Sequence, residues 1–435
     1  MQWSRYNEFI QTSDKTFHLF NCRTKKWLNL VPELYKYLTE SCTSPKDIKE
    51  IHPSLFNALL EHEFLTESIE EDISKCIEDI SAELNNMKVL KLTINPTLDC
   101  NLRCWYCYEN HLKGSEMNSV TMDAIIIFIN KCFKQYNFES LQLSFFGGEP
   151  LLKFSKIIKP LLQKIKVFCN KNKVEFIVSF TTNGIFLNKK VRTEIQKYTD
   201  KICVQIPFDG DITTHDNVKV FPNGRGSYNI IKENARGAVI DSFNVSIRCN
   251  YTKENIQTFE NVITDFKDLL SKPNLRFSFH KVWQEKDDDE LTSSVTELKN
   301  KLKNLNFTSN LTSYFGESVN LCYGDYFNSY VINYNGDVFK CTARDFNKEH
   351  RIGQLAPNGE INFNEYAQRR ICDSQTSDCF SCRRLPICPI CSQVKSETPD
   401  GKCPVHITDE IINRNIKEYF IDLLTKAKRH ENETF

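Results

Sequence analysis

The chain has 435 residues, enough for roughly two to four domains with buried cores, so a small disulfide scaffold is excluded. Hydrophobic residues make up 40% and charged residues 26%, which excludes a disordered chain and a membrane bundle. Lys+Arg and Asp+Glu both total 56, so no overall field attracts nucleic acid or an acidic membrane surface. The first residues show no signal-peptide pattern, so the cytoplasm is the expected location, with neither nucleic acid nor membrane as a partner.

Residues 1–86 are expected to form a small α+β module. β-like runs near 16–20 and 26–30 precede three helix candidates, at 33–38, 45–48 and 54–63. This order is typical of a winged helix. A DNA-binding winged helix and a structural cap are the alternatives, and the acidic second half of the module, with Glu67, Glu70 and Glu71, argues against DNA.

From residue 87 to 284, β-rich runs alternate with helical patterns, which predicts parallel βαβ units. Strands are expected at 89–94, 141–146, 175–180, 202–208, 244–250 and 275–280. Six repeats are typical of a partial (βα)6 TIM-like barrel in an α/β fold. In the segment 285–320, the helical spacing of Leu291, Val295 and Leu298 predicts an amphipathic helix that bridges two domains.

Residues 321–435 are expected to form a C-terminal domain. Its stretch 322–403 is rich in Gly, Pro and Cys turns, so we expect metal rather than a large apolar core to hold that stretch together. A last helix is predicted from the spacing of Ile412, Ile416 and Phe420.

Eighteen cysteines in a long chain without a signal peptide should be thiols or metal ligands. Seven of them are scattered, and we interpret these as small core residues. They are Cys22, Cys42, Cys76, Cys132, Cys169, Cys203 and Cys249. The others gather in two parts of the chain.

The first group is Cys100, Cys104 and Cys107, directly after the first expected barrel strand. Active sites of α/β barrels are built from loops at this end of the strands. Three thiolates can hold three irons of a cubane cluster and leave the fourth iron open to a ligand. A zinc site is the alternative, with Asp99 or His111 as a fourth ligand.

Residues 100–109, with an aromatic residue just before the third cysteine, resemble the cluster loop of the radical S-adenosylmethionine (SAM) superfamily. The segment Gly147-Gly148-Glu149-Pro150 is similar to the family segment that meets the methionine amino group. Glycines let backbone approach a ligand closely, and a carboxylate suits an ammonium. Further cofactor contacts are expected from Tyr106, Thr182, Asn183, Asp209, Arg248 and Asn250. Pro207 departs from the pattern, because the family usually has Ser there.

The resemblance implies a specific chemistry. A reduced [4Fe–4S] cluster on the three cysteines would pass one electron to SAM, which yields methionine and a 5'-deoxyadenosyl radical. An electron donor such as flavodoxin or ferredoxin is then an expected partner.

The second group resembles the SPASM domain, a C-terminal extension that holds auxiliary iron–sulfur clusters. Its pattern is Cys322, thirteen residues, Gly336, four residues, Cys341, and then Cys379-x2-Cys382-x5-Cys388-x2-Cys391 followed by Cys403. Two residues separate Cys388 from Cys391, where the family has three.

By analogy, the second auxiliary [4Fe–4S] cluster takes Cys379, Cys382, Cys388 and Cys403, and the first takes Cys322, Cys341 and Cys391. The first cluster is then one ligand short. Either it has an open iron or Cys372 closes it. A pair of zinc sites is the alternative.

SPASM enzymes mostly act on peptides or proteins. The resemblance therefore implies a maturase that abstracts hydrogen from a ribosomally made peptide to form a cross-link, a thioether or an epimer. The N-terminal module would bind the leader of the precursor peptide by strand addition. One alternative is an anaerobic sulfatase-maturating type of enzyme acting on a protein, although Thr342 stands where that branch places an Asp base. The other is a non-enzymatic, zinc-stabilised scaffold. The sequence identifies no catalytic acid or base.

Overall fold

The computed structural model describes the chain except residues 43, 222, 287, 305–320, 368–376, 399–402, 404–407 and 434–435. The chain divides into two compact units. Unit 1 comprises Met1–Asn85, Phe315–Tyr326 and Arg370–Phe435, and unit 2 comprises Asn86–Tyr314 and Phe327–Arg369. None of the helices in the described part of the chain is long and apolar enough to cross a membrane.

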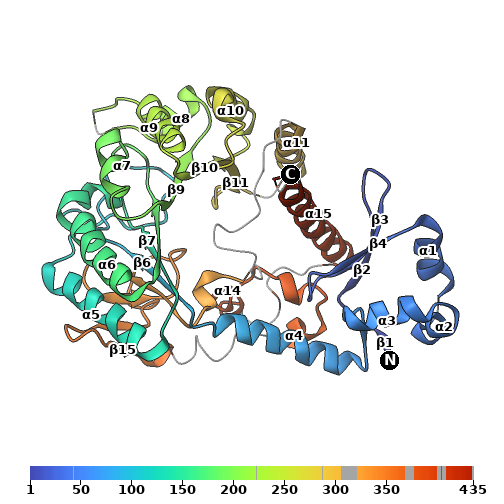
Figure 1. Cartoon of the computed structure of the whole chain (residues 1–435). Helices are drawn as coiled ribbons and strands as arrows, with labels where there is room; N and C mark the ends of the chain where they lie inside the picture. Colours follow the sequence, from blue (N-terminus) through green and yellow to red (C-terminus); the bar gives the residue numbers. More distant parts are fainter. Residues whose placement is uncertain are drawn as a thin grey trace. The chain divides into compact units, whose positions relative to one another are not determined.

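A ten-stranded sheet forms the centre of unit 2, in the order β11-β10-β9-β8-β7-β6-β12-β13-β14-β15 (Figure 1). The six expected barrel strands are confirmed, each to within one residue at its ends. They are β6 (Val89–Ile94), β7 (Ser140–Phe145), β8 (Glu175–Thr181), β9 (Lys201–Phe208), β10 (Asn244–Tyr251) and β11 (Leu275–Lys281). All six are parallel. Unit 2 is therefore a mixed α/β unit with a sheet that fits a partial TIM barrel.

Successive side chains of a strand point to opposite faces of the sheet, so each strand has an apolar face and a polar face. In β6, Leu90, Leu92 and Ile94 are buried in the core shared with the helices. On the other face, the register places Thr93 beside Ser144 of β7, and Ser144 beside Ser179 of β8. The inner face of the open barrel is therefore polar.

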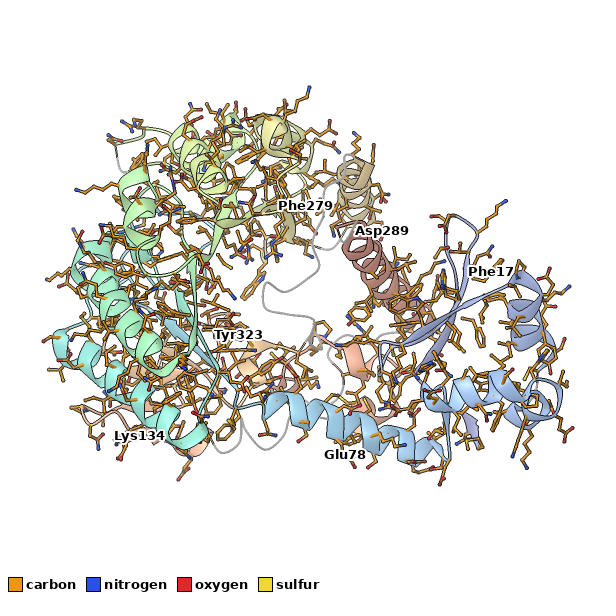
Figure 2. All side chains as sticks on the ribbon, in the orientation of Figure 1. Phe17, Glu78, Lys134, Phe279, Asp289 and Tyr323 are labelled. Atoms are coloured by element: carbon orange, nitrogen blue, oxygen red, sulfur yellow. The ribbon has the colours of Figure 1, made fainter. Side chains whose placement is uncertain are left out.

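Helices cover the outer, apolar face of these strands, as sequence periodicity predicts. Phe128 on α5, Leu162 on α6 and Ala235 on α9 are buried there, whereas Lys134 on α5 is exposed and labelled in Figure 2. The helices are α5 (Ser119–Tyr136), η2 (Pro150–Lys153), η3 (Phe154–Ile158), α6 (Lys159–Asn172), α7 (Lys189–Ile195), α8 (Ile212–Val218), α9 (Tyr228–Ile240), η4 (Ile256–Thr258), α10 (Phe259–Asp265), η5 (Lys267–Leu269) and α11 (Asp289–Asn304). The expected amphipathic helix after the sixth strand is confirmed as α11, with Leu291, Val295 and Leu298 buried.

The stretch after residue 326 extends the barrel sheet. β12 (Ser329–Ile332) pairs in parallel with β6, and β13 (Asp337–Phe339), β14 (Gly353–Leu355) and β15 (Ile361–Phe363) follow as antiparallel strands. Gly336 makes the turn between β12 and β13 at φ +85°. The expectation that metal rather than an apolar core holds the tail is wrong for this stretch, because Val331, Ile332 and Val338 are fully buried.

Unit 1 contains a three-stranded antiparallel sheet in the order β2-β3-β4. Its strands are β2 (Asn7–Gln11), β3 (Phe17–Asn21) and β4 (Trp27–Leu30), and β1 (Gln2–Trp3) pairs with β5 (Leu65–Thr66). The helices are α1 (Pro32–Lys36), η1 (Tyr37–Ser41), α2 (Pro45–Ile51), α3 (Pro53–Glu61), α4 (Ile69–Leu84), η6 (Tyr323–Asp325), α13 (Ser377–Ser381), η7 (Leu385–Ile387), α14 (Ser392–Ser396) and α15 (Asp409–Glu433). The two strands and three helices predicted before residue 64 are present.

The C-terminal helix of the chain shares a core with the N-terminal sheet. Phe420 of α15 packs against Phe20 of β3 and Trp27 of β4, with ring centroids 5.0 and 6.0 Å apart. Leu385 and Ile387 of η7 join the same cluster. Residues from both ends of the sequence thus form one unit.

Six of the seven scattered cysteines are buried, and Cys42 is partly buried. Four lie in the barrel unit, on α5, α6, β9 and β10. Their interpretation as core residues fits this burial.

Candidate functional site

The predicted site residues of unit 2 lie at the C-terminal ends of strands β6 to β10, which point to the same side of the sheet (Figure 1). The loop with Cys100 follows β6, Glu149 follows β7, Asn183 follows β8, Asp209 follows β9, and Asn250 is near the end of β10. Because parallel strands end on the same side, these side chains can converge.

The cysteine loop is held by its own hydrogen bonds. Thr97 Oγ1 donates to the carbonyl of Ser115 at 2.6 Å, and the amide of Leu98 donates to Ser115 Oγ at 2.8 Å. The two carboxylate oxygens of Asp99 accept from the amides of Cys100 and Gly114. Asp99 is the residue considered above as a possible zinc ligand. Both of its carboxylate oxygens instead stabilise the loop through these hydrogen bonds.

The three loop thiols lie close enough to influence one another. Burial raises the pKa of Cys100 to about 12, and the neighbouring Glu149, Cys104 and Cys107 add to this shift. Burial likewise raises the pKa of Cys107 to about 11. His111 Nε2 lies 3.4 Å from Cys107 Sγ. Binding to a metal cluster deprotonates such thiols, because the cluster's charge stabilises the thiolate form.

Glu149 is fully buried, and its carboxylate accepts three hydrogen bonds. Oε1 accepts from Thr182 Oγ1 at 2.7 Å and from the Leu151 amide at 2.9 Å, and Oε2 accepts from the Asn183 amide at 2.7 Å. Burial raises its pKa to about 7 although these bonds oppose the shift. A carboxylate offers about four acceptor positions, so one is left for a ligand ammonium.

The two glycines before Glu149 pack against the cysteine loop. A Cβ on Gly147 would overlap the carbonyl oxygen of Thr97, and a Cβ on Gly148 would overlap that of Asp99. The Glu149 amide also donates to the Asp99 carbonyl at 2.8 Å. In this structure the glycines therefore serve the close approach of two loops.

Four of the predicted cofactor contacts form one hydrogen-bonded network. Tyr106 Oη donates to Asp209 Oδ1 at 2.6 Å and accepts from Asn250 Nδ2 at 3.0 Å. Arg248 Nε donates to Asn250 Oδ1 at 3.0 Å. The structure thus joins Tyr106, Asp209, Arg248 and Asn250, while Thr182 and Asn183 belong to the Glu149 cluster.

Lys219 completes this network and was not predicted. Its Nζ donates to Tyr106 Oη at 2.6 Å and forms an ion pair with Asp209 Oδ2. Burial alone would lower the pKa of Lys219, but Asp209 and Tyr106 raise it overall. Lys219 follows helix α8 and does not lie at the end of a strand, so the pattern of polar residues at strand ends does not predict it.

His215 contacts the same network through the backbone of Asp209. Its Nδ1 accepts from the Asp209 amide at 3.3 Å, and its Nε2 lies 3.4 Å from Ser227 Oγ. Burial lowers the pKa of His215 to about 3, and Lys219 adds to the shift. The imidazole is therefore neutral and acts as a structural support.

In unit 1, the four cysteines expected to bind the second auxiliary cluster lie close together. Burial raises the pKa of Cys382, with contributions from Cys403 and Cys379, and Cys382 in turn raises that of Cys388. Cys322 and Cys391 form a separate pair, joined by a hydrogen bond that raises the pKa of Cys322. Cys341 belongs to unit 2, and Cys372 lies outside the described residues.

The three thiols of the loop fit the ligand set of an iron–sulfur cluster. Among the described residues, no three His, Cys, Asp or Glu side chains converge on a position for one metal ion. In a cubane each thiolate binds a different iron, which spreads the ligands apart. Asn95 and Asn101, beside the cysteine loop, also have buried amide atoms without a partner. Such atoms are expected where a polar ligand completes the site.

The radical SAM superfamily model matches residues 94–266. This stretch is a radical SAM domain. Membership implies SAM and a [4Fe–4S] cluster as cofactors, and the match covers the loop with Cys100, Glu149 and the Lys219 network.

Curated relatives share this domain and differ in how much else they share. A cysteine-type anaerobic sulfatase-maturating enzyme of Clostridium novyi is 22% identical over 78% of this chain and 96% of its own length. The radical SAM cyclopropyl synthase TigE of Paramaledivibacter caminithermalis is 24% identical over 60% of each chain. An uncharacterized protein of Methanocaldococcus jannaschii is 30% identical, but the match spans 46% of that protein and 33% of this chain.

Two solved structures have a similar fold. The enzyme anSMEcpe with bound AdoMet and the Cp18Cys peptide gives a TM-score of 0.56 at 18% identity, over 80% of this chain and all of that one. SuiB of Streptococcus suis bound to S-adenosylmethionine gives 0.52 at 17% identity, over 92% of this chain and 98% of that one. At these identities the likeness concerns the fold.

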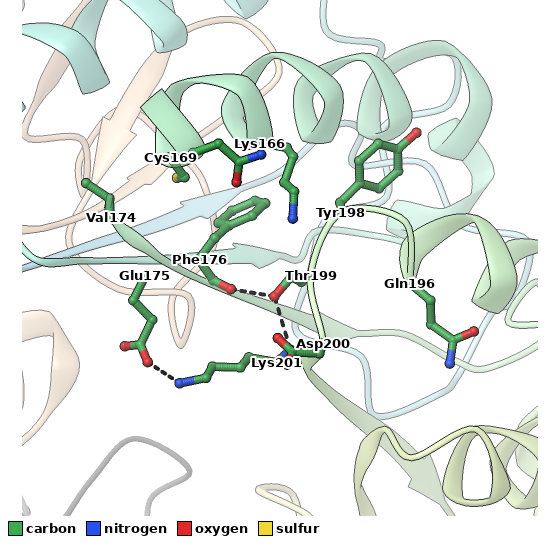
Figure 3. Close-up of a pocket in the computed structure, with 11 residues that line it drawn as sticks. Lys166, Cys169, Val174, Glu175, Phe176, Gln196, Tyr198, Thr199, Asp200 and Lys201 are labelled. Atoms are coloured by element: carbon green, nitrogen blue, oxygen red, sulfur yellow. Dashed lines mark hydrogen bonds and ion pairs between the residues drawn. The ribbon is translucent and has the colours of Figure 1, made fainter. Parts of the chain in front are cut away.

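A pocket of unit 2 lies at the opposite ends of the strands (Figure 3). Glu175 and Lys201, which begin β8 and β9, form an ion pair in its wall, and Thr199 Oγ1 donates to the Phe176 carbonyl at 2.6 Å. The N-terminal face of a barrel serves stability, so we assign no chemistry to this pocket.

Proposed function

We propose that this radical SAM enzyme abstracts hydrogen from a ribosomally made peptide and installs a cross-link, a thioether or an epimerised residue. The observation that carries the proposal is the convergence of the three-cysteine loop, Glu149 and the Tyr106 network at one edge of a sheet with a polar inner face. SPASM-like cysteines in the same chain favour a peptide or protein substrate.

In this proposal Cys100, Cys104 and Cys107 hold the cluster, which when bound supplies one electron for the cleavage of SAM. Glu149 binds the ammonium of SAM at its remaining acceptor position. Tyr106, Asp209 and Asn250 shape the adjoining wall, and Lys219 fixes their orientation. The chain thus binds and orients SAM and keeps water from the site.

Unit 1 supplies the further cofactors of the proposal. Cys379, Cys382, Cys388 and Cys403 would hold one auxiliary cluster, and the mutual influence of their thiols supports this set. Cys322 and Cys391 of unit 1 stay proposed ligands of the other. These clusters could accept the electron that is left after bond formation.

The N-terminal module would bind the leader of the peptide. The sheet order leaves β2 and β4 at the two edges of the three-stranded sheet. On β2, the carbonyl of Asn7 accepts a hydrogen bond from Arg383. An extended peptide could add to an edge through backbone hydrogen bonds.

Maturation of a sulfatase-type protein is the second candidate, because the Clostridium novyi relative matches this chain over 96% of its own length. Thr342 replaces the expected Asp base, and its carbonyl accepts a hydrogen bond from Tyr108 Oη at 2.9 Å. Asp345 nearby forms an ion pair with His350 at 3.0 Å.

Anaerobic co-expression with candidate peptides distinguishes these functions. We expect mass spectrometry to show a loss of two hydrogens for a cross-link or thioether, or deuterium uptake from heavy water for an epimer. A peptide from a sulfatase active site, offered in parallel, should stay unmodified. Modification of the sulfatase peptide alone would favour the second candidate.

A further inference from the structure

Arg248 carries a partly buried positive charge that the rest of the described site does not balance. It lies on the inner face of β10 and is largely shielded from solvent, and desolvation lowers its pKa. In the described part of the chain, its one hydrogen bond runs to Asn250, and no carboxylate lies within ion-pair distance. Buried charges are normally paired, so the guanidinium calls for an anion.

The carboxylate that influences the pKa of Arg248 already has partners. Asp209 raises the pKa of Arg248, but its two oxygens are taken by Tyr106 and Lys219. The carboxylate of Asp209 and the ammonium of Lys219 balance each other's charge. The positive charge of Arg248 is therefore left without a balancing carboxylate among the described residues.

One of its neighbours, Arg276, makes this wall of the barrel more positive. The register places Arg276 beside Ser246 and His280 beside Asn250, so both share the inner face with Arg248. Burial lowers the pKa of His280 to about 4, and Arg248 and Lys299 contribute by repulsion. A pKa of about 4 leaves His280 neutral near pH 7, so the positive charge of this wall comes from Arg248 and Arg276, and it suits a negatively charged ligand.

SAM is a poor source of that charge. Its ammonium and carboxylate share one carbon, and its proposed ammonium site is Glu149. Glu149 follows β7, three strands from β10, which is about 14 Å along the sheet.

We propose that Arg248 binds the carboxylate of an Asp or Glu side chain of the peptide substrate inside the barrel. The guanidinium fork matches a carboxylate with two parallel hydrogen bonds. This inference rests on the proposed function and specifies its substrate: an acidic residue close to the residue that is modified.

The test uses anaerobically reconstituted full-length enzyme loaded with SAM, and two probes, acetyl-Gly-Glu-Gly-amide and acetyl-Gly-Gln-Gly-amide. We expect equilibrium dialysis to show that the Glu probe binds about tenfold more tightly. Arg248→Gln should reduce this preference to about twofold or less. Arg248→Lys, which keeps the charge, should retain part of it. Arg236→Gln is the matched control, because Arg236 pairs with Asp268 outside the barrel.

Equal binding of the two probes to the wild type would overturn the inference. So would a preference that survives Arg248→Gln, and if that variant instead binds SAM tenfold more weakly, the guanidinium serves SAM. Formation of 5'-deoxyadenosine without peptide is measured in parallel. If it proceeds while the probes bind equally, the substrate inference fails and the radical chemistry stands.

Discussion

At the scale of single residues, Lys219 is the side chain on which the candidate site depends most. It is 2% exposed in its side chain and pairs with Asp209, which is 1% exposed. Removing one partner of a buried ion pair leaves the other charge without compensation. The orientation of Tyr106 depends on the same pair.

We therefore expect Lys219→Met to lower the free energy of unfolding by about 3 to 5 kcal/mol. Urea denaturation followed by circular dichroism measures the loss. The double variant Lys219→Met/Asp209→Asn should recover part of it, because the unpaired carboxylate is gone. An unchanged urea midpoint for Lys219→Met would contradict the buried pairing.

Glu149 leads to a pH prediction for SAM binding. Its pKa of about 7 means that acid protonates the carboxylate, and only the ionised form attracts an ammonium. We expect the Kd for SAM to rise up to about tenfold per pH unit as the pH falls below 7. Isothermal titration between pH 5.5 and 7 measures this. Glu149→Gln should bind more weakly and lose the pH dependence, and a variant with the same pH profile would refute the assignment.

The same pKa has a consequence for folding. The folded-state pKa of Glu149 is raised above its ordinary value of 4.5. The folded state therefore binds the proton more tightly, so ionisation of this group costs stability as the pH rises from about 4.5 to 7. Bound SAM should offset that cost.

Residue by residue, sequence predicted the candidate site where motifs fall at strand ends. Glu149 and Asp209 were expected from the resemblance of their segments to the radical SAM superfamily, and Asn250 from its place at the end of the fifth predicted strand. Lys219 and His215 were missed, since their importance comes from tertiary burial beside Asp209. No local pattern in the chain signals that burial.

At the scale of elements, the turn after β7 and the cysteine loop act as one structure. Gly148 has no room for a side chain, because a Cβ would overlap the Asp99 carbonyl, whereas Gly114 in the same loop has nothing within 4 Å. Gly148→Ala must therefore displace one loop. Gly114→Ala should cost mainly the strain of its positive φ, about 1 kcal/mol.

We accordingly expect Gly148→Ala to lose about four irons per chain after reconstitution, and Gly114→Ala to keep them. Iron analysis with protein quantitation measures both variants. Full iron loading of Gly148→Ala would show that the two loops need not touch.

Element prediction succeeded for the six barrel strands because their alternation is regular. It missed β2, α4 and the strands β12 to β15. Val331 lies on β12, which pairs with β6 far away in the sequence, and short apolar runs do not reveal such a partner. Composition predicted that metal holds the C-terminal stretch together. For residues 327–369 the structure instead shows a sheet extension with buried apolar residues, which begins with the pairing of β12 and β6.

At the scale of the whole molecule, the iron content tests how many clusters the chain holds. The proposal predicts about twelve irons per chain, at four per cubane. Cys382→Ala should lose about four of them and leave the loop cluster in unit 2 intact. Cys42→Ala is the control, because Cys42 lies in a different apolar cluster of the same unit. Equal iron in both variants would contradict an auxiliary cluster on Cys382.

The most direct test of the account is reductive cleavage of SAM by the anaerobically reconstituted protein. With dithionite and SAM, liquid chromatography should detect 5'-deoxyadenosine from the wild type and from Cys132→Ala, which removes a buried core thiol of α5. Cys104→Ala should form none. A colourless, zinc-loaded wild type that leaves SAM intact would contradict the account.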